Sequence, residues 1–133
     1  MSGLSKAEEV LKNFIIQMNQ WELKYYPLFR NEGMTVHKNA ARKDLDDIFE
    51  IFCTKKDRKQ GKQVSLSCGD PPEYSTDEEI LSCDLNKNKS SFITQQHTGF
   101  KNQYRYTLHY KNNEWRIDKK EWLDDDKWKQ AYL

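Results

Sequence analysis

Several residue patterns that mark common functional classes are missing from this sequence. The three cysteines, Cys53, Cys68 and Cys83, form no close Cys/His pair of the kind that binds zinc. An odd number of widely spaced cysteines favours free thiols in a reducing compartment, so we expect a cytoplasmic protein. No apolar run is long enough to cross a membrane, and the first residues do not resemble a secretory signal.

The chain also lacks a surplus of charge of either sign. Its 22 basic and 21 acidic residues leave a net charge of +1, whereas a nucleic-acid-binding protein needs excess positive charge against phosphate. Hydrophobic residues make up only 36% of the sequence, but aromatic residues reach 13%, and each aromatic side chain buries a large area. The 133 residues therefore predict one domain, residues 1–133, with a substantial core and no nucleic acid or membrane as a partner.

The first half of the sequence predicts two amphipathic helices. Ser5 and Glu8 match a capping box, and the apolar stripe behind them has helical spacing. That stripe consists of Val10, Leu11, Phe14, Met18, Trp21 and Tyr25. Pro27 is expected to kink or end the helix, and residues 31–33 to form a loop. A second helix is predicted after Asn39, with an apolar stripe of Ala41, Leu45, Ile48, Phe49 and Phe52, and it is expected to fade within residues 55–61.

Beyond residue 61 the apolar period changes from helical to two, which is typical of strands. Residues 63–68 and 81–85 are predicted as half-buried strands. Residues 92–97 look extended, and residues 98–102 are predicted as a connection.

The clearest structural signal is a β-hairpin in residues 103–118. Asn112 and Asn113 suit the two positive-φ positions of a tight turn. That turn sets three cross-strand pairs: Lys111 with Glu114, Tyr110 with Trp115, and Leu108 with Ile117. Opposite charges, aromatic rings and aliphatic side chains then meet, and a shift of one residue would remove all three matches.

Residues 124–133 are expected to form a short terminal helix. Helices thus fill the first half of the chain and strands most of the second. This segregation is typical of an α+β domain in which helices cover one face of an antiparallel sheet.

Few residues point to chemistry. His37, His97 and His109 are far apart in the sequence, and the outward phase of His109 favours a solvated side chain over a base or ligand. Cys68 and Cys83 lie on the apolar phases of their strands, which favours small buried thiols over nucleophiles. Phosphate-binding glycine loops, nucleophile elbows and metalloprotease helices are absent, so we assign no catalytic, cofactor-binding or metal-binding residue.

The sequence contains two acidic clusters. The one in residues 44–47 fits the solvated face of the second helix, where carboxylates near the N-terminal end complement the helix dipole. Asp124, Asp125 and Asp126 are compatible with capping a terminal helix, with a basic partner and with a divalent cation, although consecutive carboxylates alone are a weak metal signal. We retain these three residues as candidate partner-binding residues.

Aromatic residues allow two interpretations. Tyr104, Tyr106 and Tyr110 share one face of the predicted hairpin, and Trp21 and Trp115 are further aromatic candidates. They either fill the core or line a concave, partly polar pocket or interface, because each buried tyrosine hydroxyl needs a hydrogen-bond partner.

A kinked N-terminal helix, a second helix and then a curved sheet that ends in the predicted hairpin resemble the NTF2-like superfamily. Residues 111–118 are similar to the closing hairpin of that fold, in which a turn is followed by Trp, a basic residue, Ile and a small polar residue. The resemblance covers nearly the whole chain as an order of elements. It implies a cone-shaped α+β barrel, with N-terminal helices packed on a curved, mostly antiparallel sheet.

Within the superfamily, residues 14–22, the stretch 79–83 and the short chain are most similar to the NTF2-fold immunity proteins of bacterial polymorphic-toxin systems, the group that includes Rhs immunity proteins. That resemblance implies a cytoplasmic, non-catalytic protein that binds and neutralises a cognate toxin domain and uses no cofactor.

Two alternatives stay open. The superfamily also contains enzymes similar to ketosteroid isomerase and scytalone dehydratase, so a small-molecule-binding or isomerase/dehydratase-like protein would use the cone cavity. Against this, Arg116 and Asp118 fall on the outward phase, and no catalytic Asp/Tyr or Asp/His set maps onto the sequence. The other alternative is a homodimer that pairs through an exposed sheet face.

Overall fold

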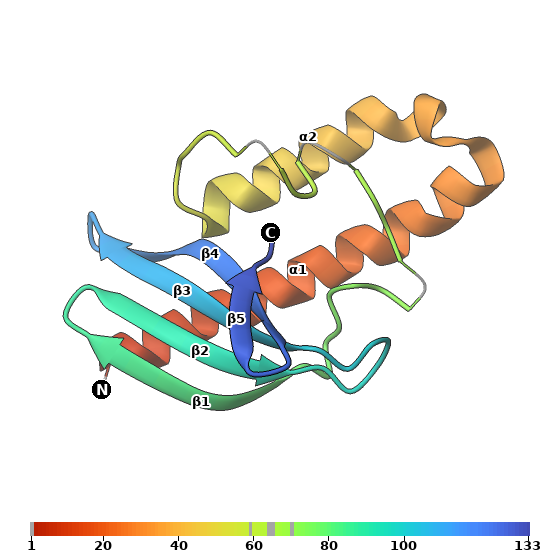
Figure 1. The fold of residues 1–133 in the computed structure, drawn as a ribbon. Coiled ribbons are helices and arrows are strands. Elements are labelled where there is room, and N and C mark those ends of the chain that lie inside the picture. The colour runs from red at the N-terminus through yellow and green to blue at the C-terminus, as the bar shows by residue number, and fades with distance from the viewer. Residues whose placement is uncertain (1, 59, 64–65, 70) are drawn as a thin grey trace.

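A computed structural model describes residues 2–58, 60–63, 66–69 and 71–133, with side chains from residue 5 onward. These residues form two helices followed by five strands (Figure 1). The elements are α1 (Ser2–Glu32), α2 (Met34–Phe52), β1 (Glu79–Asn86), β2 (Lys89–Gln95), β3 (Gln103–Lys111), β4 (Glu114–Asp124) and β5 (Lys127–Gln130).

The strands form one sheet in the order β1-β2-β3-β4-β5, and every neighbouring pair is antiparallel. Helix α1 crosses one face of this sheet, and α2 returns beside α1 (Figure 1). The predicted α+β class, with N-terminal helices packed on an antiparallel sheet, is confirmed.

The apolar stripe of α1 forms the centre of the core. Leu11, Phe14, Met18, Trp21 and Tyr25 are all buried, as their helical spacing predicts. The core also contains the predicted stripe of α2 and inward side chains of the sheet, among them Ala41, Leu45, Ile48, Phe49, Phe92, Tyr106, Leu108, Trp115 and Ile117.

The capping box predicted at Ser5 was wrong, and of the two outcomes expected at Pro27 the helix end does not occur. The helix begins at Ser2, so Ser5 lies inside it and cannot be the N-cap. It also continues through Pro27 to Glu32. Phe29 beyond the proline stacks against Tyr25 before it, with ring centroids 5.6 Å apart. Packing on both sides of the proline therefore outweighs the hydrogen bond that proline cannot make.

The connection between the helices is shorter than predicted. Gly33 alone separates α1 from α2, and its φ of 89° lies in a region that glycine adopts without strain. Helix α2 consequently begins at Met34 instead of after Asn39, and it ends at Phe52, ahead of the charged run.

The strand predicted for residues 63–68 was wrong in the part that the structure describes. Val64 and Ser65 lie outside the described residues, and residues 66–69 form no strand. The buried carboxylate of Glu22 instead accepts backbone N–H groups from this region and the turn after it: Gly69 at 3.1 Å, Glu73 at 2.9 Å and Tyr74 at 2.8 Å. These donors are satisfied by a side chain of α1 and not by a neighbouring strand.

The predicted hairpin is confirmed in its turn and its register. Asn112 and Asn113 have φ values of 55° and 65°. The three predicted cross-strand pairs all occur, and the rings of Tyr110 and Trp115 lie 5.2 Å apart. Beyond them the register shifts, because Leu108 pairs with Ile117 whereas Thr107 pairs with Lys119.

The terminal helix predicted for residues 124–133 was wrong. Strand β4 continues to Asp124, and a tight turn at Asp125, whose φ is 57°, leads into β5. Aspartate tolerates this left-handed conformation better than most residues, so the acidic triplet serves as a hairpin turn. The alternating apolar residues Leu123 and Trp128 then pair across the two strands.

Candidate functional site

The β3–β4 hairpin has a hollow at each end. At the turn end, Tyr110 and Trp115 border a groove of about 630 Å³, which we call the hairpin-end groove. At the other end, Tyr104, Lys120 and Trp122 border a cavity of about 570 Å³, which we call the Lys120 cavity.

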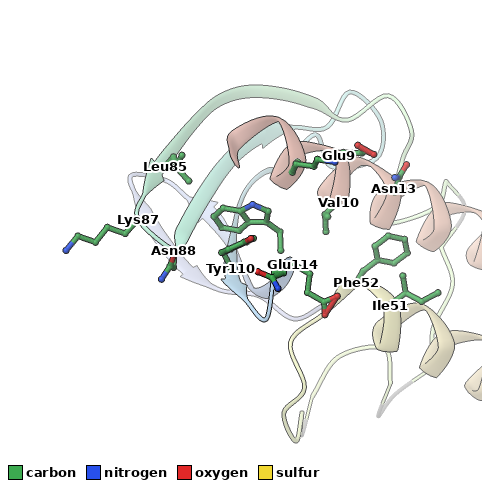
Figure 2. Close-up of a pocket in the computed structure, with 13 residues that line it drawn as sticks. Glu9, Val10, Asn13, Ile51, Phe52, Leu85, Lys87, Asn88, Tyr110 and Glu114 are labelled. Carbon is green, nitrogen blue, oxygen red and sulfur yellow. The ribbon is translucent and has the colours of Figure 1, made fainter. Parts of the chain in front are cut away.

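The hairpin-end groove is built by four parts of the chain (Figure 2). Val10 comes from α1, Phe52 from the end of α2, Leu85 from the end of β1 and Tyr110 from β3. The charged side chains of the groove are Lys6, Glu9, Lys87 and Glu114. Lys87 extends away from the other labelled residues in Figure 2, so it lies at the rim.

Apolar side chains remain exposed around this groove. Ile51 is 63% exposed, Leu85 44% and Tyr110 38%. Trp115, by contrast, is buried beneath Tyr110. An aromatic pair that is half in the core and half at the surface, surrounded by accessible aliphatic side chains, has the composition of a protein-binding patch.

The Lys120 cavity has a buried lysine in its wall. Lys120 is only 6% exposed, and its Nζ lies 4.1 Å from the ring centroid of Tyr104, 4.3 Å from that of Tyr74 and 5.6 Å from that of Tyr106. Burial lowers the pKa of Lys120 to about 8, because the charged form loses hydration.

A β-bulge places this lysine inside. Asp118 is the extra residue of β4 at the register shift, so the inward phase passes from Trp115 and Ile117 to Lys120. Asp118 itself points to the segment after α2, where it accepts a hydrogen bond from Thr54 at 2.8 Å and one from Lys56 at 3.2 Å. The bulge thereby changes which side chains face the core.

Three carboxylates act on Lys120 through space, but each has other partners. Glu22 accepts the three backbone N–H groups described above, and Glu73 pairs with Lys62. Glu78 accepts the Thr94 hydroxyl at 2.6 Å, and burial raises the pKa of its carboxyl.

The candidate residues Asp124, Asp125 and Asp126 lie at the exposed turn between β4 and β5. Asp124 pairs with Lys129 of β5, and Lys127 follows the turn directly. These two lysines nearly balance the local negative charge, so the acidic corner is weaker than the sequence suggests.

The three histidines are separated, as their positions in the sequence suggest. His37 lies in α2, not in a loop, and contacts Glu32 at 3.0 Å. His97 contacts Glu79 at 3.0 Å, and His109 lies 3.9 Å from Asp118. All three belong to partly or fully exposed surface contacts.

The prediction of two buried strand thiols was wrong for Cys83, which is exposed, and Cys68 is only partly buried outside any strand. Burial raises the pKa of the Cys53 and Cys68 thiols to about 12, so both stay protonated and poorly nucleophilic near neutral pH. Among the described residues, no group of three or more His, Cys, Asp or Glu side chains is placed to hold a metal ion. Over the same residues, no helix has the length and apolar character needed to span a membrane.

The two helices pack on an antiparallel sheet, and a hollow lies at each end of the β3–β4 hairpin. This architecture defines an α+β protein of NTF2-like class. More specifically, the chain belongs to the NTF2 fold immunity protein family, whose sequence model matches residues 6–132. It is 72% identical over 130 residues to the immunity protein RhsIA of Dickeya dadantii (strain 3937), an alignment that covers 96% of each chain. No solved structure matches the chain.

Sequence reasoning placed Tyr104, Tyr106 and Tyr110 on one face but did not separate them. The structure places Tyr104 and Tyr106 around Lys120, whereas Tyr110 borders the hairpin-end groove. Trp21 is a core residue whose indole N–H donates to the Ala41 carbonyl at 2.9 Å. Lys120 was missed because its inward position depends on the bulge, which strict alternation does not reveal.

Proposed function

We propose that this immunity protein neutralises its toxin by direct binding in the cytoplasm, without catalysis, and that residues 1–133 act as one domain. An immunity function is supported by the family to which the chain belongs and by the name of its relative. Direct binding is the simplest physical route, because a bound protein can cover the active surface of a small toxin domain.

The observation that supports this route is the exposed apolar rim of the hairpin-end groove. Ile51, Leu85 and Tyr110 come from three different elements and remain accessible. Protein interfaces concentrate their binding energy in a few aromatic and aliphatic anchors surrounded by polar residues. The groove offers that arrangement with an already ordered tyrosine, so little side-chain entropy is lost on binding.

Asp124, Asp125 and Asp126 have a different part in this proposal. They lie at the far end of β4 from the groove, about 33 Å away at 3.3 Å per strand residue. A standard interface covers about 800 Å² per partner, a patch roughly 30 Å across. We therefore assign the triplet to electrostatic steering of a basic toxin at the edge of the interface, where charge affects association more than affinity.

The test is an exposed apolar-to-acid substitution in the groove with a matched substitution elsewhere on the same helix. Ile51→Glu buries a charge in the proposed interface, whereas Val36→Glu alters a side chain of similar exposure, 69% against 63%. The two positions are about 22 Å apart along α2 at 1.5 Å per residue. Affinity for the cognate toxin domain is measured by calorimetry.

We expect Ile51→Glu to weaken toxin binding at least tenfold and Val36→Glu to leave it within about twofold. Circular dichroism checks that both variants fold. Equal affinities for Ile51→Glu and the original protein would remove the groove from the interface. Failure of the folded protein to bind the toxin at all would remove direct binding itself.

A further inference from the structure

Lys120 is a buried cation whose hydrogen-bonding capacity the described residues leave unused. Its ammonium is ringed by Tyr74, Tyr104 and Tyr106, and it forms no ion pair or hydrogen bond with any side chain in the ranges that the structure describes. An aromatic face attracts a cation but does not accept strong hydrogen bonds. A buried ammonium is costly unless it is paired.

The neighbouring carboxylates do not remove this cost. Glu78, Glu73 and Glu22 all act on Lys120 through space, yet each is committed to other donors at shorter range. Lys62, the other cation of the cavity, is itself engaged with Glu73 and with the Ser67 carbonyl, the latter at 2.9 Å. Of these two lysines, Lys120 is therefore the one without a direct hydrogen-bonding partner among the described residues.

The cavity around this charge has the size and walls of a small-molecule site. Its volume of about 570 Å³ lies within the range of about 300–1,000 Å³ typical of ligand pockets. Tyr74, Tyr104 and Trp122 provide flat apolar walls, and Asn102 adds a polar group. Such a space suits a planar organic body with one charged end.

We propose that the Lys120 cavity binds a small organic monocarboxylate, which pairs its carboxylate with the Lys120 ammonium and places its planar body between the aromatic walls. A monoanion is favoured over phosphate because a single unpaired cation faces it and three carboxylates lie nearby. This site is separate from the hairpin-end groove, so it adds a ligand to a protein whose proposed role is to block a toxin.

Benzoate and its neutral analogue benzamide are suitable probes, since they share a ring and differ in charge. Each is titrated into nitrogen-15-labelled protein, and the indole N–H signal of Trp122 is followed by NMR. The indole of Trp115, which borders the other hollow, serves as an internal reference. The titrations are repeated on Lys120→Met and on Lys119→Met, which removes a neighbouring exposed lysine.

We expect benzoate to shift the Trp122 signal in a saturable manner. Binding should be about tenfold weaker for benzamide, and about tenfold weaker for benzoate in Lys120→Met. Lys119→Met should behave like the original protein. The proposal is overturned if benzoate produces no saturable shift, or if benzamide binds equally well.

The comparison of benzoate with benzamide needs no variant, so the result stands even if Lys120→Met does not fold. Toxin affinity of Lys120→Met separates this proposal from the previous one, because we expect it to be unchanged. A loss of toxin affinity without any benzoate binding would assign the ammonium to the protein partner and would overturn the small-molecule site.

Discussion

The β3–β4 hairpin and the edge strand β1 have similar apolar alternation but very different burial. In the β3–β4 hairpin, Tyr106, Leu108 and Ile117 are fully buried. In β1, Leu81 and Leu85 remain 48% and 44% exposed.

The difference follows from position in the sheet. Cys83 pairs with Phe92, and Leu85 with Ser90. Both partners are buried on the helix-covered face, and paired residues point to the same side. Cys83 and Leu85 therefore point to the helix side as well, but β1 is an edge strand, and the hairpin-end groove beside α1 leaves Leu85 accessible. Alternation predicts a strand and its faces, whereas coverage depends on where the strand lies in the sheet.

The largest effect that tests this comparison is expected from Leu108→Ala. The substitution leaves a cavity in the core and should lower the free energy of unfolding by about 2–5 kcal/mol. Leu85→Ala, with the same chemical change at the edge, should cost less than about 1 kcal/mol. Urea unfolding measures both, and equal losses would contradict the contrast between the β3–β4 hairpin and strand β1.

The next largest effect on stability is expected at Lys120, the buried charged residue of the β3–β4 hairpin. Lys120→Met should raise the free energy of unfolding at pH 7 by up to about 3 kcal/mol, because it removes a buried ammonium whose pKa is lowered from 10.5 to about 8. A loss of stability would show that the tyrosine rings and neighbouring carboxylates fully compensate the charge.

The same pair of proteins gives a pH dependence. Between pH 8 and 10.5 the unfolded chain keeps the Lys120 proton that the folded protein has lost, so folding at this residue becomes less costly as pH rises. The stability gain of Lys120→Met should be full below pH 8 and vanish near pH 10.5. Cys53 and Cys68 also titrate differently on unfolding, but they do so in both proteins and cancel in the difference.

A smaller effect is expected at the two turns. The β1–β2 turn places Lys87 at a φ of 57°, and the β3–β4 turn places Asn112 at 55°. Lysine is strained in this region, whereas asparagine tolerates it and glycine is free there. Lys87→Gly should stabilise the protein by about 0.5–1 kcal/mol, and Asn112→Ala should destabilise it by about 1 kcal/mol. Thermal unfolding of the two variants would show the opposite signs.

The smallest effect lies beyond both hairpins, at the β4–β5 turn. Asp125→Asn combined with Asp126→Asn should slow association with the toxin several-fold at low salt and hardly at all at high salt. Asparagine also tolerates the positive φ of Asp125, so the turn should persist. Asp46→Asn with Asp47→Asn on α2 is the matched control, and stopped-flow mixing gives the rates. An unchanged rate at low salt would exclude the turn from steering.

The parts of the fold that were predictable are those in which local chemistry and packing agree. Asn112 and Asn113 specify a turn whose register brings matched side chains together, so the hairpin could be read from the sequence. Pro27, where a kink or an end was expected, does not end the helix because tertiary packing outweighs its local preference. A helix was predicted at Asp125, but the left-handed conformation of this residue forms a tight turn, and the residues on either side pair as strands.

The candidate site was less predictable than the fold. The hairpin-end groove is lined by residues from four segments that are far apart in the sequence. No spacing in the sequence indicates that these segments lie together. The Asp124–Asp126 triplet was visible as a charge cluster, but the lysines that offset it become neighbours only when β5 folds back on β4.

The extra residue at Asp118 has a consequence for how this protein can vary. Lys119 and Lys120 are adjacent and chemically identical, and only the irregularity before them selects which one enters the interior. Deleting Asp118 would remove the irregularity and keep Lys120 opposite Tyr106, whereas a regular strand that retained Asp118 would exchange the inner and outer side chains of all later residues. Because both residues are lysines, either register keeps an internal cation, but a relative of the same length without the irregularity would be expected to turn Glu121 inward and Trp122 outward.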